Sequence, residues 1–169
     1  MGQVFSFPNP VNEKAARFVA FVVMVAAIVA LATGWQWLLV PIAYGFVARA
    51  AAGPTFSPLG RLAMDVVAPR SLGEKRPTPG PPKRFAQAIG AVVTTAAAVG
   101  GLALGWTAFA NVCLGLMVVF AGLESLAGIC VGCKAFAVLM RMGVIPPETC
   151  EACNDIWSRP GVTRPGASA

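Results

Sequence analysis

The chain has 169 residues, of which 57% are hydrophobic and 12% charged, and its mean hydropathy is +0.71. A globule of this size cannot bury so much apolar surface, so the composition excludes a soluble protein and predicts an integral membrane protein. The net charge is +6, but no basic stripe interleaved with aromatic residues is present, so nucleic acid is not expected as a partner.

Residues 1–12 predict an irregular arm, and Asn12 is placed to cap a helix that begins near Glu13. Four apolar stretches follow, each near the roughly 20 residues that cross a bilayer core. We expect spans at 15–33, 35–52, 85–106 and 107–133. Together they predict an all-α, four-helix membrane bundle within residues 13–136.

The first of these stretches has an alternative interpretation as a secretory signal peptide. Lys14 and Arg17 precede an apolar run, and small residues follow it. We favour a membrane span, because three more apolar segments follow it. Gly34 and the pair Gly105-Trp106 are the expected breaks between neighbouring spans.

The connection between the second and third spans, 53–84, has two parts. Apolar residues recur at helical spacing between Pro58 and Val67, whereas Arg61 and Asp65 fall on the opposite face. This pattern predicts a short helix lying in the membrane interface. The following stretch, 69–82, holds five prolines and two glycines and predicts an irregular linker.

The basic residues predict the orientation in the membrane. The turns TGWQW and LGWTAFAN, between the first two and the last two spans, carry no Lys or Arg, and all thirteen cations can lie on the other side. By the positive-inside rule both termini and the central connection are cytoplasmic. Three tryptophans in the uncharged turns then mark the outer interface: Trp35, Trp37 and Trp106.

Two Cys-x-x-Cys pairs are the candidate functional residues. Cys130 and Cys133 end the fourth predicted span, and Cys150 and Cys153 follow in the cytoplasmic segment 137–169. The spacing C-x2-C-x16-C-x2-C is in the range of four-thiolate zinc sites, because paired thiolates from two knuckles complete a tetrahedron. His, the commonest alternative ligand, is absent from the chain.

Three interpretations of these pairs remain open: a structural zinc site, redox dithiols that exchange electrons or sulfur with a soluble partner, and an iron-sulfur centre. The last is least favoured, because Lys134 and Asn154 replace the Gly that often follows such knuckles.

The two pairs differ in expected electrostatics. Cys130 and Cys133 are expected near a helix C-terminus, which disfavours a thiolate, whereas Cys150 is expected in the first turn of a short helix begun by Pro146. If the pairs are redox dithiols, the sequence therefore predicts Cys150 as the nucleophile and Cys153 as the resolving thiol. A permanent disulfide is not expected in the reducing cytoplasm.

Glu124 is the only carboxylate well inside a predicted span. Such a group is costly, so it is either a protonated side chain bonded to a neighbouring helix or a proton or ligand site. Arg49 is expected to extend to the interface rather than pair with it. Cys113, eleven residues earlier on nearly the same helical face, is expected to be a small packing residue.

Three ordered motifs carry a resemblance to a known family: GPTFSPLGRLA, GPPKRFAQAIG and LESLAGICVGCKAF. The chain resembles, over residues 10–136, the bacterial membrane family called domain of unknown function 4395. The resemblance implies that five features belong together: Phe56 to Leu59, Lys83 to Gln87, Glu124, Cys130 and Cys133. It implies no biochemical activity, and the second cysteine pair is a less general feature of the pattern.

These observations predict a small bacterial inner-membrane protein. Its cytoplasmic Cys-x-x-Cys pairs are expected to handle thiol-disulfide or sulfur-transfer chemistry with a thioredoxin-like or sulfurtransferase partner. The first alternative is a non-enzymatic membrane scaffold whose four cysteines hold a structural zinc. A weaker alternative is a small transporter that uses Glu124.

Overall fold

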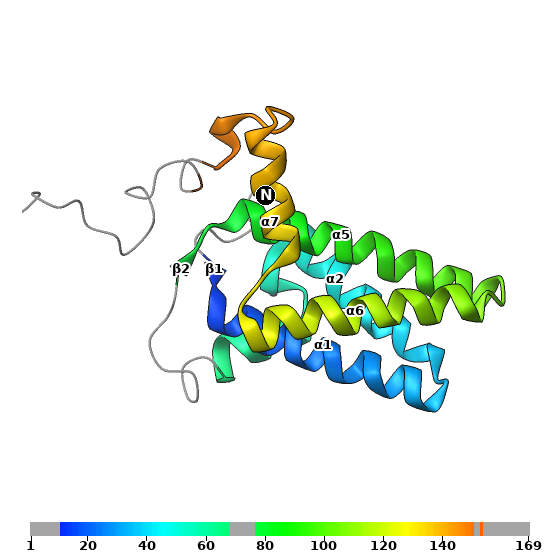
Figure 1. Ribbon diagram of the computed structural model, residues 1–169. Helices are drawn as coiled ribbons and strands as arrows, with labels where there is room; N and C mark the ends of the chain where they lie inside the picture. Colours follow the sequence, from blue (N-terminus) through cyan, green and yellow to red (C-terminus); the bar gives the residue numbers. More distant parts are fainter. Residues whose placement is uncertain (1–10, 68–76, 151–152, 154–169) are drawn as a thin grey trace, which may run out of the picture.

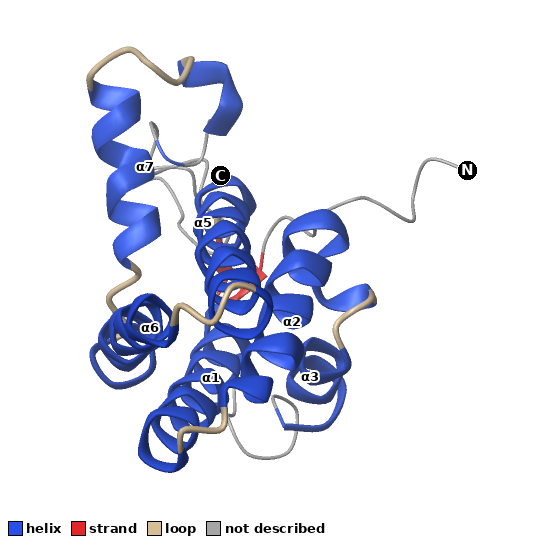
Figure 2. Ribbon diagram, turned by 90° about the vertical axis from the view of Figure 1, so that its right-hand side faces the viewer, coloured by secondary structure: helices blue, strands red, loops and turns tan. Residues whose placement is uncertain are grey.

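The structure, a computed structural model, describes residues 11–67, 77–150 and 153. Four helices lie alongside one another: α1 (Glu13–Thr33), α2 (Leu39–Ala52), α5 (Gly80–Ala98) and α6 (Thr107–Ala127), as Figures 1 and 2 show. The expected N-terminal arm lies outside the described residues except for 11 and 12. The expected Asn12 cap is confirmed, because its side chain accepts a hydrogen bond from the backbone of Lys14 at 3.2 Å.

Three helical segments of the described chain are long and apolar enough to cross a membrane. They are α1, α6, and α5 together with the π-helical turn η4 (Val99–Ala103) that continues it. The second expected span forms the 3-10 turn η1 (Gln36–Leu38) and α2, which has 14 residues. At 1.5 Å per residue α2 is about 21 Å long, less than a bilayer core of about 30 Å.

Smaller elements fill the connections. The expected helix before the linker is present as α3 (Pro58–Arg61) and the π-helical turn η3 (Leu62–Val67), preceded by the 3-10 turn η2 (Gly53–Thr55). The strands β1 (Val11–Asn12) and β2 (Pro77–Thr78) pair antiparallel, with Val11 opposite Thr78. After α6 come α7 (Val131–Arg141) and the 3-10 turn η5 (Pro147–Cys150).

The helices pack through small side chains. α1 packs most extensively against α6 and α2 against α5, whereas α1 and α2 touch little. Fully buried alanines line these contacts at positions 27, 30, 97 and 110. A Cβ on Gly90 of α5 would lie 2.4 Å from the Phe46 ring of α2, so glycine permits this close approach.

Hydrogen bonds show which helix ends lie together. Arg17, near the start of α1, donates to the backbone oxygens of Ser125 (3.0 and 3.2 Å) and Leu126 (3.0 Å) at the end of α6. Arg84, near the start of α5, donates to the backbone oxygen of Ala50 at the end of α2 at 3.0 Å. All four helices therefore run between the same two ends of the molecule.

The fourth expected span, 107–133, ends earlier than its sequence predicts. Gly128 adopts φ +69° and stops α6 at Ala127, and the backbone N–H of Ile129 bonds to the oxygen of Leu123 at 3.0 Å. This is the hydrogen-bonded glycine stop of many helices. The chain then turns sharply away from the axis of α6 and enters α7 (Figure 1).

Large apolar side chains remain exposed along the candidate spans. They include Phe21 and Ile28 of α1, Val92 of α5, and Val112 and Val119 of α6. Exposed apolar faces on long helices are compatible with contact to membrane lipid.

Candidate functional site

The first cysteine pair lies at the start of α7. Cys130 is the N-cap residue, and its Sγ accepts a hydrogen bond from the backbone N–H of Cys133 at 3.4 Å. The expectation that this pair ends a helix is therefore wrong, because Gly128 separates it from α6. The positive end of the α7 dipole now favours a thiolate at Cys130 instead of opposing it.

The two sulfurs of this pair interact directly. Cys133 Sγ donates a hydrogen bond to Cys130 Sγ across 2.7 Å, and both cysteines are free thiols. This bond lowers the pKa of Cys130, although burial and the charge of Glu124 oppose it, and Lys83 assists it. The same bond, together with burial, raises the pKa of Cys133. Of the two thiols, Cys130 therefore loses its proton more readily, and Cys133 holds the proton between them.

A buried ion pair lies beside the dithiol. Lys83 Nζ in the first turn of α5 contacts Glu124 Oε1 in the last turn of α6 at 2.5 Å, with side chains 6% and 16% exposed. One of the two alternatives for Glu124 was a protonated side chain bonded to a neighbouring helix. Glu124 is bonded to a neighbouring helix, but the bond is an ion pair with Lys83. Sequence reasoning placed Lys83 in the linker and missed it as a partner, because α5 begins at Gly80 rather than near Phe85.

Arg49 is buried rather than extended to the interface, so that expectation is wrong. Its Nε donates to Gln87 Oε1 at 2.9 Å, its Nη1 donates to Ser57 Oγ at 3.3 Å, and its guanidinium lies 4.8 Å from the Phe46 ring centre. Ser57 also accepts the backbone N–H of Gly60 as the N-cap of α3. The FSPL turn is linked in this way to the KRFAQ start of α5.

A cavity of about 200 Å³ connects these groups. Its polar wall contains Arg49, Lys83, Gln87, Glu124 and Cys130, and most of the remaining wall is apolar side chains of α1, α2, α5 and α6. We call it the dithiol cavity. Lys83 to Gln87, Glu124 and Cys130, which the family resemblance grouped, all contribute residues to its wall. Phe56 to Leu59 do not line the cavity, but Ser57 accepts a hydrogen bond from Arg49, which does.

Close backbone packing sets the position of the dithiol. A Cβ on Gly132 would lie 2.5 Å from Ala86 Cβ and 2.7 Å from Ala86 Cα of α5. Further along α7, the Phe136 ring packs edge-on against Phe85, with centroids 5.6 Å apart. Because Ala86 is one helical turn beyond Lys83, this contact holds Cys130 next to the ion pair.

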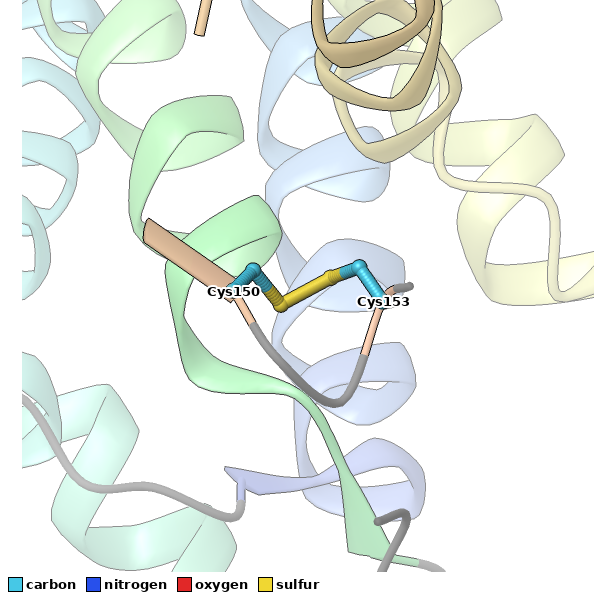
Figure 3. Close-up of a disulfide and its surroundings, with 2 residues drawn as sticks. All are labelled: Cys150 and Cys153. Atoms are coloured by element: carbon cyan, nitrogen blue, oxygen red, sulfur yellow. A yellow bond between two sulfur atoms is a disulfide. The ribbon is translucent and has the colours of Figure 1, made fainter. Parts of the chain in front are cut away.

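The second pair, Cys150 and Cys153, is joined by a disulfide with Cα atoms 5.3 Å apart (Figure 3). The expected short helical turn before it is present as η5, of which Cys150 is the last residue, but the bond to Cys153 leaves no thiolate at Cys150 for a helix N-terminus to stabilise. The disulfide itself was not expected.

The four cysteines do not fit a zinc cage in this arrangement. The Cys150–Cys153 bond leaves neither sulfur as a thiolate, and within 11–67, 77–150 and 153 no three His, Cys, Asp or Glu side chains are grouped for a metal. The zinc site with Cys130, Cys133, Cys150 and Cys153 stays a prediction. Cys113 is 6% exposed within the helix core, as a packing residue should be.

Comparison with known proteins gives one positive finding. No curated protein and no solved structure matches the chain. A family model described as domain of unknown function (DUF4395) matches residues 11–141, which include α1 to α7 and both Cys130 and Cys133. The resemblance noted from the three motifs is confirmed, and the chain belongs to the DUF4395 family.

Proposed function

We propose that this protein carries out thiol-disulfide exchange through Cys130 and Cys133 with a soluble thioredoxin-like or sulfurtransferase partner. The observation that carries the proposal is the position of Cys130. It caps α7, accepts the Cys133 hydrogen bonds and lies beside the Lys83–Glu124 pair. Helix N-termini and neighbouring cations are the environments that make cysteines reactive.

The exchange follows from the two pKa directions. The Cys130 thiolate attacks one sulfur of a partner disulfide, forms a mixed disulfide and releases the other partner sulfur as a thiolate. Cys133 then loses its proton to solvent and attacks Cys130 Sγ, which lies 2.7 Å away. The Cys130–Cys133 disulfide forms, the partner leaves as a dithiol, and the reverse sequence oxidises a partner dithiol.

We further propose a bacterial inner-membrane location with both termini in the cytoplasm. The start of α1, the end of α2, the start of α5 and the end of α6 share one end of the molecule. The described basic residues of the central connection, Arg61, Lys83 and Arg84, and those of α7 belong to this end, and positive residues favour the cytoplasmic side. The dithiol cavity would then face soluble cytoplasmic partners.

The test uses glutathione disulfide as the probe and the full chain with Cys150 and Cys153 replaced by Ser. We expect Cys133→Ser to accumulate a stable mixed disulfide with glutathione at Cys130, because the resolving thiol is absent. Cys130→Ser should react at least tenfold more slowly, because the remaining thiol of Cys133 does not occupy the helix-capping position and its burial still raises its pKa. Intact-mass spectrometry measures both products.

Cys113→Ser is the matched control and should react like the parent. Reduced thioredoxin added to the oxidised parent should become oxidised. Equal reaction rates for Cys130→Ser and Cys133→Ser would contradict the proposal. Stoichiometric zinc in the purified wild-type chain, with all four thiols unreactive until a chelator is added, would favour the structural zinc alternative instead.

A further inference from the structure

The dithiol cavity extends from Cys130 into the region of the candidate spans. Its apolar wall includes Val19 and Val23 of α1, Met117 and Phe120 of α6, and Phe46 of α2. Phe120 lies about 10 Å along the helix axis from the end of α6. A dithiol that serves only soluble partners has no need of an apolar cavity behind it.

The cavity wall includes apolar side chains that are not buried. Ile89 of α5 is 41% exposed and Phe120 of α6 is 40% exposed, and both line the cavity. α5 and α6 pack against each other, so these two side chains mark an apolar entrance between neighbouring helices. An apolar molecule dissolved in the membrane can enter here without crossing water.

The polar end of the cavity supplies hydrogen-bond donors. Lys83 carries three N–H donors, of which one bonds Glu124, and the charges of Arg49 and Lys83 exceed that of Glu124 by one. Such a site favours an acceptor oxygen on which negative charge develops during a reaction. A flat apolar ring that carries a carbonyl oxygen matches this combination of walls, with the carbonyl toward Lys83 and the ring against the apolar side chains.

We propose that the dithiol cavity binds the ring of a membrane quinone, which accepts the two electrons of the Cys130–Cys133 dithiol. This inference rests on the proposed function, because it requires Cys130 and Cys133 to cycle between dithiol and disulfide. At about 200 Å³ the cavity is smaller than the roughly 300 Å³ or more of pockets that enclose drug-sized ligands. It suits a ring whose isoprenoid tail remains in the lipid.

The step balances in atoms and electrons. Cys130 sulfur adds to a ring carbon, and Lys83 donates a hydrogen bond to the carbonyl oxygen that gains charge. Cys133 sulfur then attacks Cys130 sulfur; the S–S bond forms, and the sulfur–carbon bond breaks with its electron pair passing to the ring. The two thiol protons end on the two oxygens, so dithiol and quinone become disulfide and quinol. A reduced soluble partner then restores the dithiol.

The test uses the full chain with Cys150 and Cys153 replaced by Ser, reduced, freed of reductant and held in lipid nanodiscs. Decylubiquinone is added, and its loss of absorbance and the remaining free thiols are followed together. We expect one quinone reduced per Cys130–Cys133 disulfide formed. Ala20→Leu, which fills the cavity from α1, should lower the initial rate at least tenfold.

The matched control is Ala108→Leu, the same change at an exposed position of α6 outside the cavity, which should retain the rate. Both variants should still react with glutathione disulfide. A photoreactive azidoquinone should label peptides of α1 or α6 in the unsubstituted cavity, which tests binding even where Ala20→Leu does not fold.

Two results would overturn the quinone proposal: thiols that react with glutathione disulfide but stay reduced with quinone, or label found only outside α1, α2, α5 and α6. Thiols inert to both oxidants would overturn the proposed function as well, so the two failures are distinguishable.

Discussion

At the scale of single residues, the Lys83–Glu124 pair is the costliest feature of the site to disturb. Lys83→Met leaves the Glu124 carboxylate buried without its partner, which typically destabilises a protein by about 3–5 kcal/mol. We expect a lower unfolding temperature in detergent, measured by circular dichroism. Lys83→Met combined with Glu124→Gln should recover part of the loss, because no unpaired charge remains.

Arg61→Met is the control for this prediction, because Arg61 is a basic residue with an exposed side chain. It should change the unfolding temperature little. If Lys83→Met has no greater effect than Arg61→Met, the ion pair does not contribute to stability.

The pH dependence of Cys130 alkylation is a second residue-scale prediction. The Cys133 hydrogen bond lowers the pKa of Cys130, so its thiolate persists to lower pH than that of an ordinary cysteine. The rate of iodoacetamide labelling should therefore begin to fall only at a correspondingly lower pH. The Glu124 charge raises the pKa of Cys130, so Glu124→Gln should move the profile further down in pH.

Peptide mass spectrometry resolves Cys130 from the other thiols in this experiment, and the unfolded chain is the reference. A profile that coincides with that of the unfolded chain would show that the capping position does not activate Cys130.

The sequence identified the types of residue in the site better than their partners. Glu124, Cys130 and Cys133 were recognised because a carboxylate in an apolar stretch and a Cys-x-x-Cys pair are visible in one dimension. Arg49 was not recognised, and Lys83 was grouped with them only by the family resemblance, because basic residues next to a span are ordinarily explained by the positive-inside rule. Their burial depends on contacts with helices distant in the sequence.

At the scale of elements, two helix boundaries decide the chemistry. The start of α5 at Gly80 places Lys83 inside a helix, and the end of α6 at Ala127 gives the dithiol a helix of its own. The apolar pattern runs on through Ile129 and Val131, so hydropathy alone extends the span to Cys133. Gly128 was the available signal for the helix end, because a glycine in the left-handed region commonly ends a helix.

Gly132→Ala tests the contact between α7 and α5. The added Cβ would meet Ala86 backbone and side chain at 2.5–2.7 Å, so α7 must move. We expect a loss of about 1–3 kcal/mol, as in other overpacked sites, and slower formation of the Cys130–Cys133 disulfide. Denaturant unfolding and thiol titration during mild oxidation measure the two effects.

Gly115→Ala is the matched control, because it lies in α6 with nothing within 4 Å of its added Cβ. It should leave disulfide formation unchanged and stabilise the helix by up to about 1 kcal/mol. Equal behaviour of the two variants would show that the α5–α7 contact does not position the dithiol.

At the scale of the whole molecule, the orientation across the membrane is testable by labelling. In a chain whose native cysteines are replaced by Ser, Trp35→Cys and Lys134→Cys introduce thiols at exposed positions of opposite ends. An impermeant maleimide added to intact cells should modify Trp35→Cys only. Modification of Lys134→Cys alone would invert the proposed topology.

The bond network of Arg17 has a consequence for how the protein is made. Its partners Ser125 and Leu126 lie more than a hundred residues downstream, and the helix that carries them supplies the largest contact of α1. At ribosomal rates of 5–20 residues per second, the first helix waits between about 5 and 20 s for them. Until the last long helix is made, the Arg17 guanidinium lacks these backbone acceptors, and in the proposed membrane location water or lipid phosphates would take their place.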